Sequence, residues 1–312
     1  MKEVSGLGEL GRLIVIAGAT ATGKSDLSVA LAREIGAEII NADSMQLYRG
    51  MDIGTAKLTM QERGGIAHHM IDILDVDEDA TVASYQESAR TVADALLAEG
   101  KRVVVVGGTG LYIKAFLDDL QFPDTDPVIR QKIFAESEVL GGDEMHQRLS
   151  RLDPAAAAAI PKENLRRVVR ALEVIEITGK PFTAHLPRQG EGSYPFAQQF
   201  GLVMERENLR ERIDQRVDRM WERGLVGEVD LLIERGILAG KTARAAIGYA
   251  QIIAMREGRL SESEAREETK RATRAFARRQ ETWFSRDERI TWVKESTTDA
   301  RLTMILDQIN VP

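Results

Sequence analysis

Residues 18–25 of the chain read GATATGKS and directly follow the apolar run LIVIA at residues 13–17. A G-x-x-x-x-G-K-[ST] pattern between a strand and a helix predicts a phosphate-binding loop, in which backbone N–H groups close around a diphosphate. Lys24 supplies positive charge to the same oxygens, and the Ser25 hydroxyl is placed to bind Mg²⁺. The alternative is a glycine-rich turn without a ligand. The expected loop consists of Gly18, Ala19, Thr20, Ala21, Thr22, Gly23, Lys24 and Ser25.

Two further residues that could do chemistry follow strand-like runs. Asp43 comes after EIINA (38–42), and Thr109 follows RVVVV (102–106) within the sequence GGTG. Phosphate-loop ATPases carry a carboxylate after a later strand, and the run 102–106 ends without one. Asp43 therefore suits removal of a proton from an acceptor better than a metal site for hydrolysis. The alternatives are that Asp43 caps its strand in a turn with Ser44 and that the Thr109 hydroxyl satisfies its own turn.

The segments that must position these residues alternate between two patterns. Strands are expected at 12–17, 38–42 and 102–106, and helices at 24–35 and 81–99. This alternation predicts an α/β fold, a doubly wound parallel sheet with a phosphate loop, whose ligands lie at the carboxyl ends of the strands. The phosphate loop, Asp43 and Thr109 should therefore share one crevice.

The alternation stops near residue 124. Capping residues at Asp126, Asp143, Asp153 and Asn164 predict successive helix starts. We expect a phosphate-loop core at 1–123, an all-helical insertion domain at 124–196 and the second part of the core at 197–312. In the second part, strands are expected at 199–204 and 290–293, and helices at about 207–222, 226–235 and 243–257. A long helix should follow Ser261, which forms a capping box with Glu264.

Composition limits the class of protein. The 312 residues are 43% hydrophobic and include no cysteine, which excludes disulfides, thiolate metal sites and cysteine nucleophiles. No apolar stretch reaches the length of a membrane span, and the N-terminus lacks the apolar segment of a signal peptide. We therefore expect a cytoplasmic protein with no membrane partner.

The net charge of −7 hides an uneven distribution of basic residues. One stripe should lie on the long helix, opposite an apolar stripe of Ala272, Phe276 and Trp283 by which that helix would dock. Such clusters on an acidic chain favour a phosphate-rich partner, and the alternative is solvated helix faces paired with glutamates. The clusters are Lys270, Arg271, Arg274 and Arg278; Arg166, Arg167 and Arg170; and Arg206, Arg210, Arg212 and Arg216.

Several segments together resemble the tRNA dimethylallyltransferase family. The similarity runs in order from about residue 12 to residue 294, and GGTGLY with DSMQ-x-Y is more specific than the phosphate loop alone. The segments are GATATGKS (18–25), DSMQLYRGMDIGTAK (43–57), HHMID (68–72), GGTGLYIKA (107–115), DPVIR (126–130), NLRRVVRALEV (164–174), AIGYAQ (246–251) and RAFARRQETWF (274–284).

The resemblance implies transfer of a dimethylallyl group from its diphosphate to N6 of the adenosine immediately 3′ of a tRNA anticodon. Asp43 would accept the proton of the amine, Thr109 would lie near the reacting groups, and the phosphate loop with Mg²⁺ would stabilise the leaving diphosphate. Arg212 or Arg216 could add charge there. Ser44, Met45 and Gln46 would hold the target base, which must be flipped out of its loop. The implied tRNA contacts are Arg130, Arg166, Arg167, Val168, Val169 and Arg170, to which the basic stripe adds Arg274 and Arg278.

Three alternatives remain at this stage. A small-molecule or nucleoside kinase would use the phosphate loop and a base at Asp43, but it leaves the arginines of the insertion unexplained. A prenyltransferase acting on free adenine nucleotides would share the chemistry with less need of the insertion. A non-catalytic, nucleotide-gated RNA-binding protein would have no need of Asp43. The expected partners are tRNA and dimethylallyl diphosphate, with no obligate protein partner, and the sequence leaves open whether ATP binds the loop.

Overall fold

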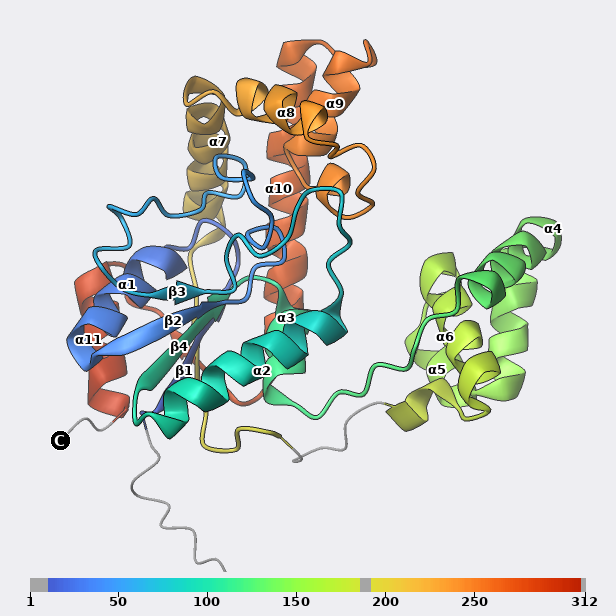
Figure 1. The fold of residues 1–312 in the computed structure, drawn as a ribbon, viewed down its shortest axis with the longest axis horizontal. Coiled ribbons are helices and arrows are strands. Elements are labelled where there is room, and N and C mark those ends of the chain that lie inside the picture. Colours follow the sequence, from blue (N-terminus) through green and yellow to red (C-terminus); the bar gives the residue numbers. More distant parts are fainter. Residues whose placement is uncertain (1–10, 186–191, 310–312) are drawn as a thin grey trace, which may run out of the picture. The chain divides into compact units, whose positions relative to one another are not determined.

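The computed structural model describes residues 11–185 and 192–309 (Figure 1). Its centre is one six-stranded sheet with the order β3-β2-β4-β1-β5-β6, in which every pairing is parallel. The central strand β1 pairs Leu13 with Val103 on one side and Ile14 with Gln198 on the other. The strands are β1 Leu13–Gly18, β2 Ala37–Asn41, β3 His68–His69, β4 Arg102–Gly107, β5 Gln198–Leu202 and β6 Ile290–Val293.

Helices cover both faces of this sheet, which confirms the expected doubly wound α/β fold. Successive residues of a strand point to opposite faces, so β1 contributes Leu13 and Val15 to one core and Ile14 and Ile16 to the other. α2 (Val82–Ala98) and α3 (Gly110–Leu117) close the first core, whereas α1 (Lys24–Ile35) and α11 (Thr298–Gln308) close the second. Burial on both faces explains the continuous apolar runs in β1 and β4.

Four more helices lie toward the carboxyl ends of the strands, and the last of them runs on beside the sheet, where its Phe284 joins the first core (Figure 1). They pack around Tyr48 and Met51, both fully buried, and form a third core. The capping box of Ser261 and Glu264 starts α10 as expected. These helices are α7 Arg206–Glu222, α8 Leu225–Glu234, α9 Tyr249–Arg256 and α10 Glu262–Phe284, with a 3₁₀ turn at Ala243–Ala245 before α9.

The chain divides into two compact units, Asp118–Ser193 and the remainder. The smaller unit contains α4 Pro127–Leu152, α5 Pro154–Ala159, α6 Leu165–Thr178 and a 3₁₀ turn at Phe182–His185, so it is helical, and its bounds lie close to the expected 124–196. Asp126, Asp153 and Asn164 cap α4, α5 and α6 as expected. Non-helical backbone at Gly141 (φ 79°, ψ 165°) divides α4 into two helices, so the second helix begins close to the expected start at Asp143.

No helix in the two described ranges is long and apolar enough to cross a membrane.

Candidate functional site

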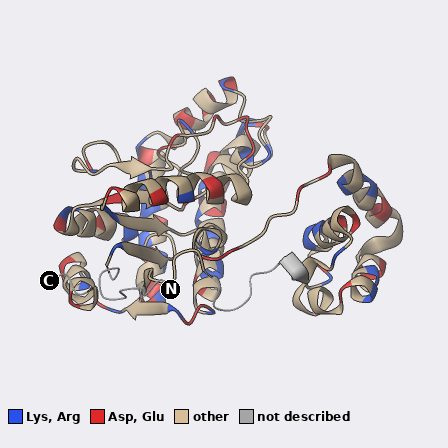
Figure 2. Cartoon of the chain, turned by 60° about the horizontal axis from the view of Figure 1, so that its bottom comes forward, with Lys and Arg blue, Asp and Glu red and all other residues tan. Residues whose placement is uncertain are grey.

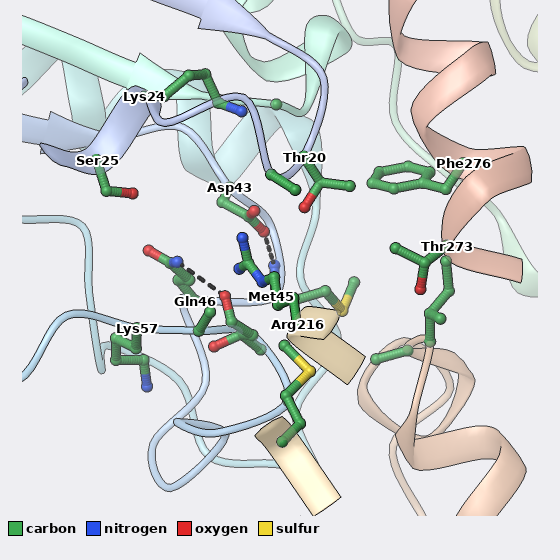
Figure 3. A pocket seen from close by; sticks show the side chains of 18 of the residues that line it. Thr20, Lys24, Ser25, Asp43, Met45, Gln46, Lys57, Arg216, Thr273 and Phe276 are labelled. Atoms are coloured by element: carbon green, nitrogen blue, oxygen red, sulfur yellow. Dashed lines mark hydrogen bonds between the residues drawn. The ribbon is translucent and has the colours of Figure 1, made fainter. Parts of the chain in front are cut away.

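The carboxyl ends of β1, β2 and β4 open into a cavity of about 630 Å³ in the larger unit. Lys24 and Ser25 reach it from the start of α1, Asp43 from the end of β2 and Thr109 from the end of β4. Helices α7 and α10 form its opposite side, and Phe276 of α10 lies across from the phosphate loop (Figure 3). The structure thus brings the residues singled out in the sequence into one crevice.

The phosphate loop is shaped by glycines and by its own carbonyl groups. Gly18 (φ 143°) packs so closely on β5 that a Cβ there would lie 3.1 Å from the Leu202 carbonyl oxygen, and Gly23 (φ 93°) precedes α1 in a left-handed conformation. The Thr22 hydroxyl and Lys24 Nζ donate to the Ala19 carbonyl at 2.8 and 2.6 Å. Gly18, Ala19 and Thr22 therefore support the loop from behind, whereas Thr20, Ala21, Gly23, Lys24 and Ser25 line the cavity.

The cations around the phosphate loop are buried, and the carboxylate of Asp43 interacts with them. Burial lowers the pKa of Lys24 to about 7; Asp43 opposes this shift and Arg216 adds to it. Burial also lowers the pKa of Arg216, with Asp43 again opposing. Arg212 Nε donates to the Ala21 carbonyl at 3.0 Å, so it is anchored to the loop itself. An anion bound here would meet two α7 arginines and Lys24, and it would favour the charged form of the lysine.

Asp43 is held in place through both its backbone and its side chain. Asn41 donates to the Asp43 carbonyl at 3.0 Å and accepts the Asp43 N–H at 3.1 Å. Asp43 Oδ1 accepts the Met45 N–H at 3.0 Å, which is the strand-end turn that we weighed as an alternative to catalysis. Within the described part of the chain, Oδ2 makes no hydrogen bond, and the residue lines the cavity. The turn fixes one oxygen, and the other can serve a ligand.

Thr109 connects two loops of the site and does not satisfy its own turn. Its Oγ1 accepts the Ser44 N–H at 3.2 Å and donates to Ser44 Oγ at 3.4 Å, and its backbone N–H donates to the Ala42 carbonyl at 3.3 Å. A Cβ at Gly107 would lie 2.2 Å from the same carbonyl oxygen. Glycine at 107 therefore lets the loop after β4 approach the loop after β2.

Gln280 of α10 is a site residue that the sequence did not reveal. Its Nε2 donates to the Gly108 carbonyl at 2.8 Å, and its Oε1 accepts the Thr20 N–H at 2.8 Å. One buried amide thus joins the loop after β4 to the phosphate loop. A Cβ at Gly108 would lie 2.3 Å from this Nε2, and one at Gly110 would lie 2.1 Å from the Trp283 ring. Two sequence signals could have found it: the glycines of GGTG, which indicate a close neighbour, and the position of Gln280 within the segment RAFARRQETWF.

The docking face that we expected for α10 is wrong. Its buried residues are Ala265, Thr269, Ala277, Gln280 and Phe284, whereas Ala272, Phe276 and Trp283 are partly exposed. Two residues of the expected basic stripe form ion pairs with α7: Lys270 pairs with Asp218 at 2.8 Å, and Arg274 pairs with Asp214. Arg278 is exposed and makes no ion pair within the described ranges.

In the smaller unit, the residues implied as tRNA contacts fall into three groups. Arg130 and Arg170 bind the fully buried Glu173 at 2.9 and 3.0 Å, so they neutralise an internal carboxylate. The side chains of Val168 and Val169 are buried in the core of the unit and offer no surface to a partner. Arg166 and Arg167 are exposed, and no ion pair involves them in the described part of the chain. Basic and acidic residues are interspersed on these helices (Figure 2).

The fold and the site define a class of protein, an α/β phosphate-loop protein with a carboxylate placed beside the loop. The family model described as IPP transferase matches residues 46–287, and the chain belongs to this family.

Curated relatives and solved structures agree with that assignment. The chain is 54% identical over 288 residues to a tRNA dimethylallyltransferase of Streptomyces coelicolor, which covers 92% of each chain. It is 56% identical to that of Thermobifida fusca, over 92% of this chain and 91% of the relative. A tRNA isopentenylpyrophosphate transferase of Bacillus halodurans matches with a TM-score of 0.70 and 39% identity, over 96% and 95% of the two chains. A eukaryotic dimethylallyltransferase acting on tRNA matches with a TM-score of 0.79 and 27% identity, over 96% and 80%.

Proposed function

We propose that this protein transfers the dimethylallyl group of dimethylallyl diphosphate to N6 of the adenosine that is 3′-adjacent to a tRNA anticodon, which gives N6-isopentenyladenosine. The supporting observation is the cavity that joins the phosphate loop to Asp43, with apolar side chains beyond them. Relatives at more than half identity that are named tRNA dimethylallyltransferase support the same activity. A tRNA substrate also supports a cytoplasmic location.

The leaving group is the first part of this proposal. The diphosphate lies on the N–H groups at the start of α1, beside Lys24 and Arg216, with Arg212 at the edge of the loop. Charge that develops on the bridging oxygen as the carbon–oxygen bond breaks is stabilised by these fixed cations.

Mg²⁺ fits this loop as a partner of the diphosphate. The Ser25 hydroxyl lines the cavity, and Mg²⁺ usually takes only one or two protein ligands together with substrate phosphates and water. Ser25 would hold the ion, which when bound neutralises charge on the diphosphate.

The acceptor is an adenine flipped out of the anticodon loop. Ser44, Met45 and Gln46 hold the base against Asp43. The lone pair of the exocyclic amine is delocalised into the ring, so attack on the allylic carbon gains from proton removal at the same time. The nitrogen–carbon bond forms, the carbon–oxygen bond breaks, the diphosphate leaves with the electron pair, and Asp43 Oδ2 takes the proton.

The remaining wall of the cavity suits the five-carbon tail and the base. Apolar and aromatic side chains contribute to this wall beside polar ones such as Thr269, Thr273 and Arg279, and the apolar ones can exclude water from the reacting carbon. The apolar and aromatic residues are Met45, Ile53, Ile213, Val217, Met220, Ile247, Tyr249 and Phe276.

The test is direct incubation with both substrates. Purified protein is mixed with dimethylallyl diphosphate and Mg²⁺ and with either tRNA or AMP, and the nucleosides are analysed by mass spectrometry. We expect a mass gain of one dimethylallyl group on a single adenosine of the tRNA. Prenylation of AMP in place of tRNA, or no product with either acceptor, would overturn the proposal.

A further inference from the structure

The carboxylate of Glu228, on α8, binds a run of backbone N–H groups in the loop that borders the cavity. Its Oε2 accepts the N–H groups of Asp52 and Ile53 at 3.1 and 2.7 Å, and its Oε1 accepts that of Gly54 at 3.2 Å. Successive N–H groups that converge on one anion form a nest, which usually receives a phosphate or a metal cluster. Here the protein supplies the anion itself, so this loop is held by charge as well as by hydrogen bonds.

Tyr249 of α9 completes this arrangement. Its hydroxyl donates to Glu228 Oε1 at 2.5 Å, and its ring lies so close to Gly54 that a Cβ there would be 2.5 Å from it. Tyr249 is fully buried, and burial raises the pKa of its hydroxyl, which therefore remains a donor. Loop 52–54 therefore packs against the Tyr249 ring and is hydrogen-bonded to the Glu228 carboxylate.

The same loop sets the direction of the Gln46 amide. Gln46 Nε2 donates to the Thr55 carbonyl at 3.1 Å, and the Thr55 hydroxyl donates to the Met51 carbonyl at 2.6 Å. Because a carbonyl oxygen can only accept, the NH₂ group of Gln46 must face Thr55 and its Oε1 must face the other way. Gln46 and Thr55 both line the cavity, and the Gln46 side chain is visible beside Asp43 and Met45 in Figure 3.

This orientation is the one that adenine requires. The base presents an N6–H donor next to a ring nitrogen acceptor, so a glutamine that reads it must offer Oε1 to N6 and an N–H to the ring. With the amide turned over, donor would face donor at N6 and acceptor would face acceptor at the ring.

We propose that Glu228 is a positioning residue that fixes the Thr55 carbonyl, and through it the Gln46 amide, so that the site selects adenine. The proposal rests on the proposed function of the same cavity. Glu228 acts through loop 52–55, and Tyr249 assists it by holding the carboxylate. The diphosphate part of the cavity is formed by other residues and does not depend on this loop.

The experiment compares two anticodon stem-loop RNAs that carry adenosine or purine riboside, which lacks the N6 amine, at the target position. Their competition for the protein gives a discrimination ratio. Glu228→Gln places an NH₂ group against the nest, and we expect it to lower the ratio about tenfold, the worth of roughly one hydrogen bond. Glu234→Gln, on the exposed side of the same helix, is the matched control and should leave the ratio unchanged.

A double-mutant cycle separates positioning from a general structural effect. Gln46→Leu should remove the discrimination by itself, and Glu228→Gln should then have no further effect in that background, because both changes act on one contact. Affinity for inorganic diphosphate, which lacks the tail, should stay at the wild-type value in Glu228→Gln and Gln46→Leu. If Glu228→Gln does not fold, Tyr249→Phe keeps the ring, removes only the hydroxyl and should lower the ratio a few-fold.

The outcomes are distinct. An unchanged ratio in Glu228→Gln, independent effects of Glu228→Gln and Gln46→Leu, or an equal loss of diphosphate affinity would each overturn the positioning role. A wild-type protein that binds the stem-loop but never prenylates it contradicts the proposed function, and the ratio can still be measured in that case.

Discussion

Lys24 gives the sharpest prediction, because its charge depends on its surroundings. Burial in the phosphate loop lowers the pKa of this amine to about 7. A bound diphosphate places negative charge beside the amine and raises the pKa again. Above pH 7, binding must therefore be accompanied by uptake of a proton, and affinity must fall as the pH rises further.

The size of this effect follows from the pKa. An amine with a pKa of about 7 is neutral in about 0.1 of the molecules at pH 6 and in about 0.9 at pH 8. If the bound amine stays charged, proton uptake per diphosphate rises from about 0.1 to about 0.9 across this range. Over the same range the affinity attributable to Lys24 falls about tenfold, or about 1.4 kcal/mol.

Calorimetry measures this uptake. Dimethylallyl diphosphate is titrated into the protein at pH 6, 7 and 8, in pairs of buffers with different ionisation enthalpies, and the slope of heat against ionisation enthalpy gives the protons taken up. Lys24→Met is the control, because protons exchanged by the ligand itself cancel in the difference between the two proteins. Equal proton uptake by wild type and Lys24→Met at pH 8 would refute this account of the loop.

Three further predictions concern other parts of the molecule. Asp43→Asn should lower single-turnover prenylation about 10²–10⁴-fold with little change in tRNA affinity, and rates near wild type would exclude Asp43 as the base. Gln280→Leu leaves the Gly108 carbonyl and the Thr20 N–H unpaired, so calorimetry should show about 10–100-fold weaker diphosphate binding. Unchanged affinity would mean that the phosphate loop keeps its shape without Gln280. Reversing the charge of Arg166 and Arg167 should weaken tRNA binding and reduce the slope of affinity against salt by about one unit or less for each phosphate no longer bound. Arg170→Gln should instead lower the melting temperature, because it leaves Glu173 without one of its partners. Salt slopes equal to wild type would assign Arg166 and Arg167 to a solvated helix face.

The parts of the protein that depend on local patterns could be predicted from the order of the residues. Apolar runs fixed β1 and β4, left-handed glycines and capping residues fixed the ends of α1, α4 and α10, and parallel strands required Lys24, Asp43 and Thr109 to meet at one edge. Each of these conclusions needs only residues near in the chain and the rule that strand ends share an edge.

The polar groups that meet across the fold became known only from the three-dimensional arrangement of the helices and loops. Gln280 reaches Gly108 over 172 residues, and Glu228 reaches Asp52 over 176 residues. A glutamine or glutamate on a helix has the same local signature whether it is solvated or buried against a loop, so no periodicity could distinguish these two residues from their neighbours.

The same reason explains the misjudged face of α10. Its apolar residues Phe276 and Trp283 indicated a docking side, yet the helix buries Thr269 and Gln280, whose polar atoms find backbone partners. Lys270 and Arg274 were expected to be part of an exposed basic stripe, but in the fold they pair with Asp218 and Asp214 of α7. A sequence states which groups a helix carries, but what a buried or charged group is worth depends on the partner that the rest of the fold places opposite it.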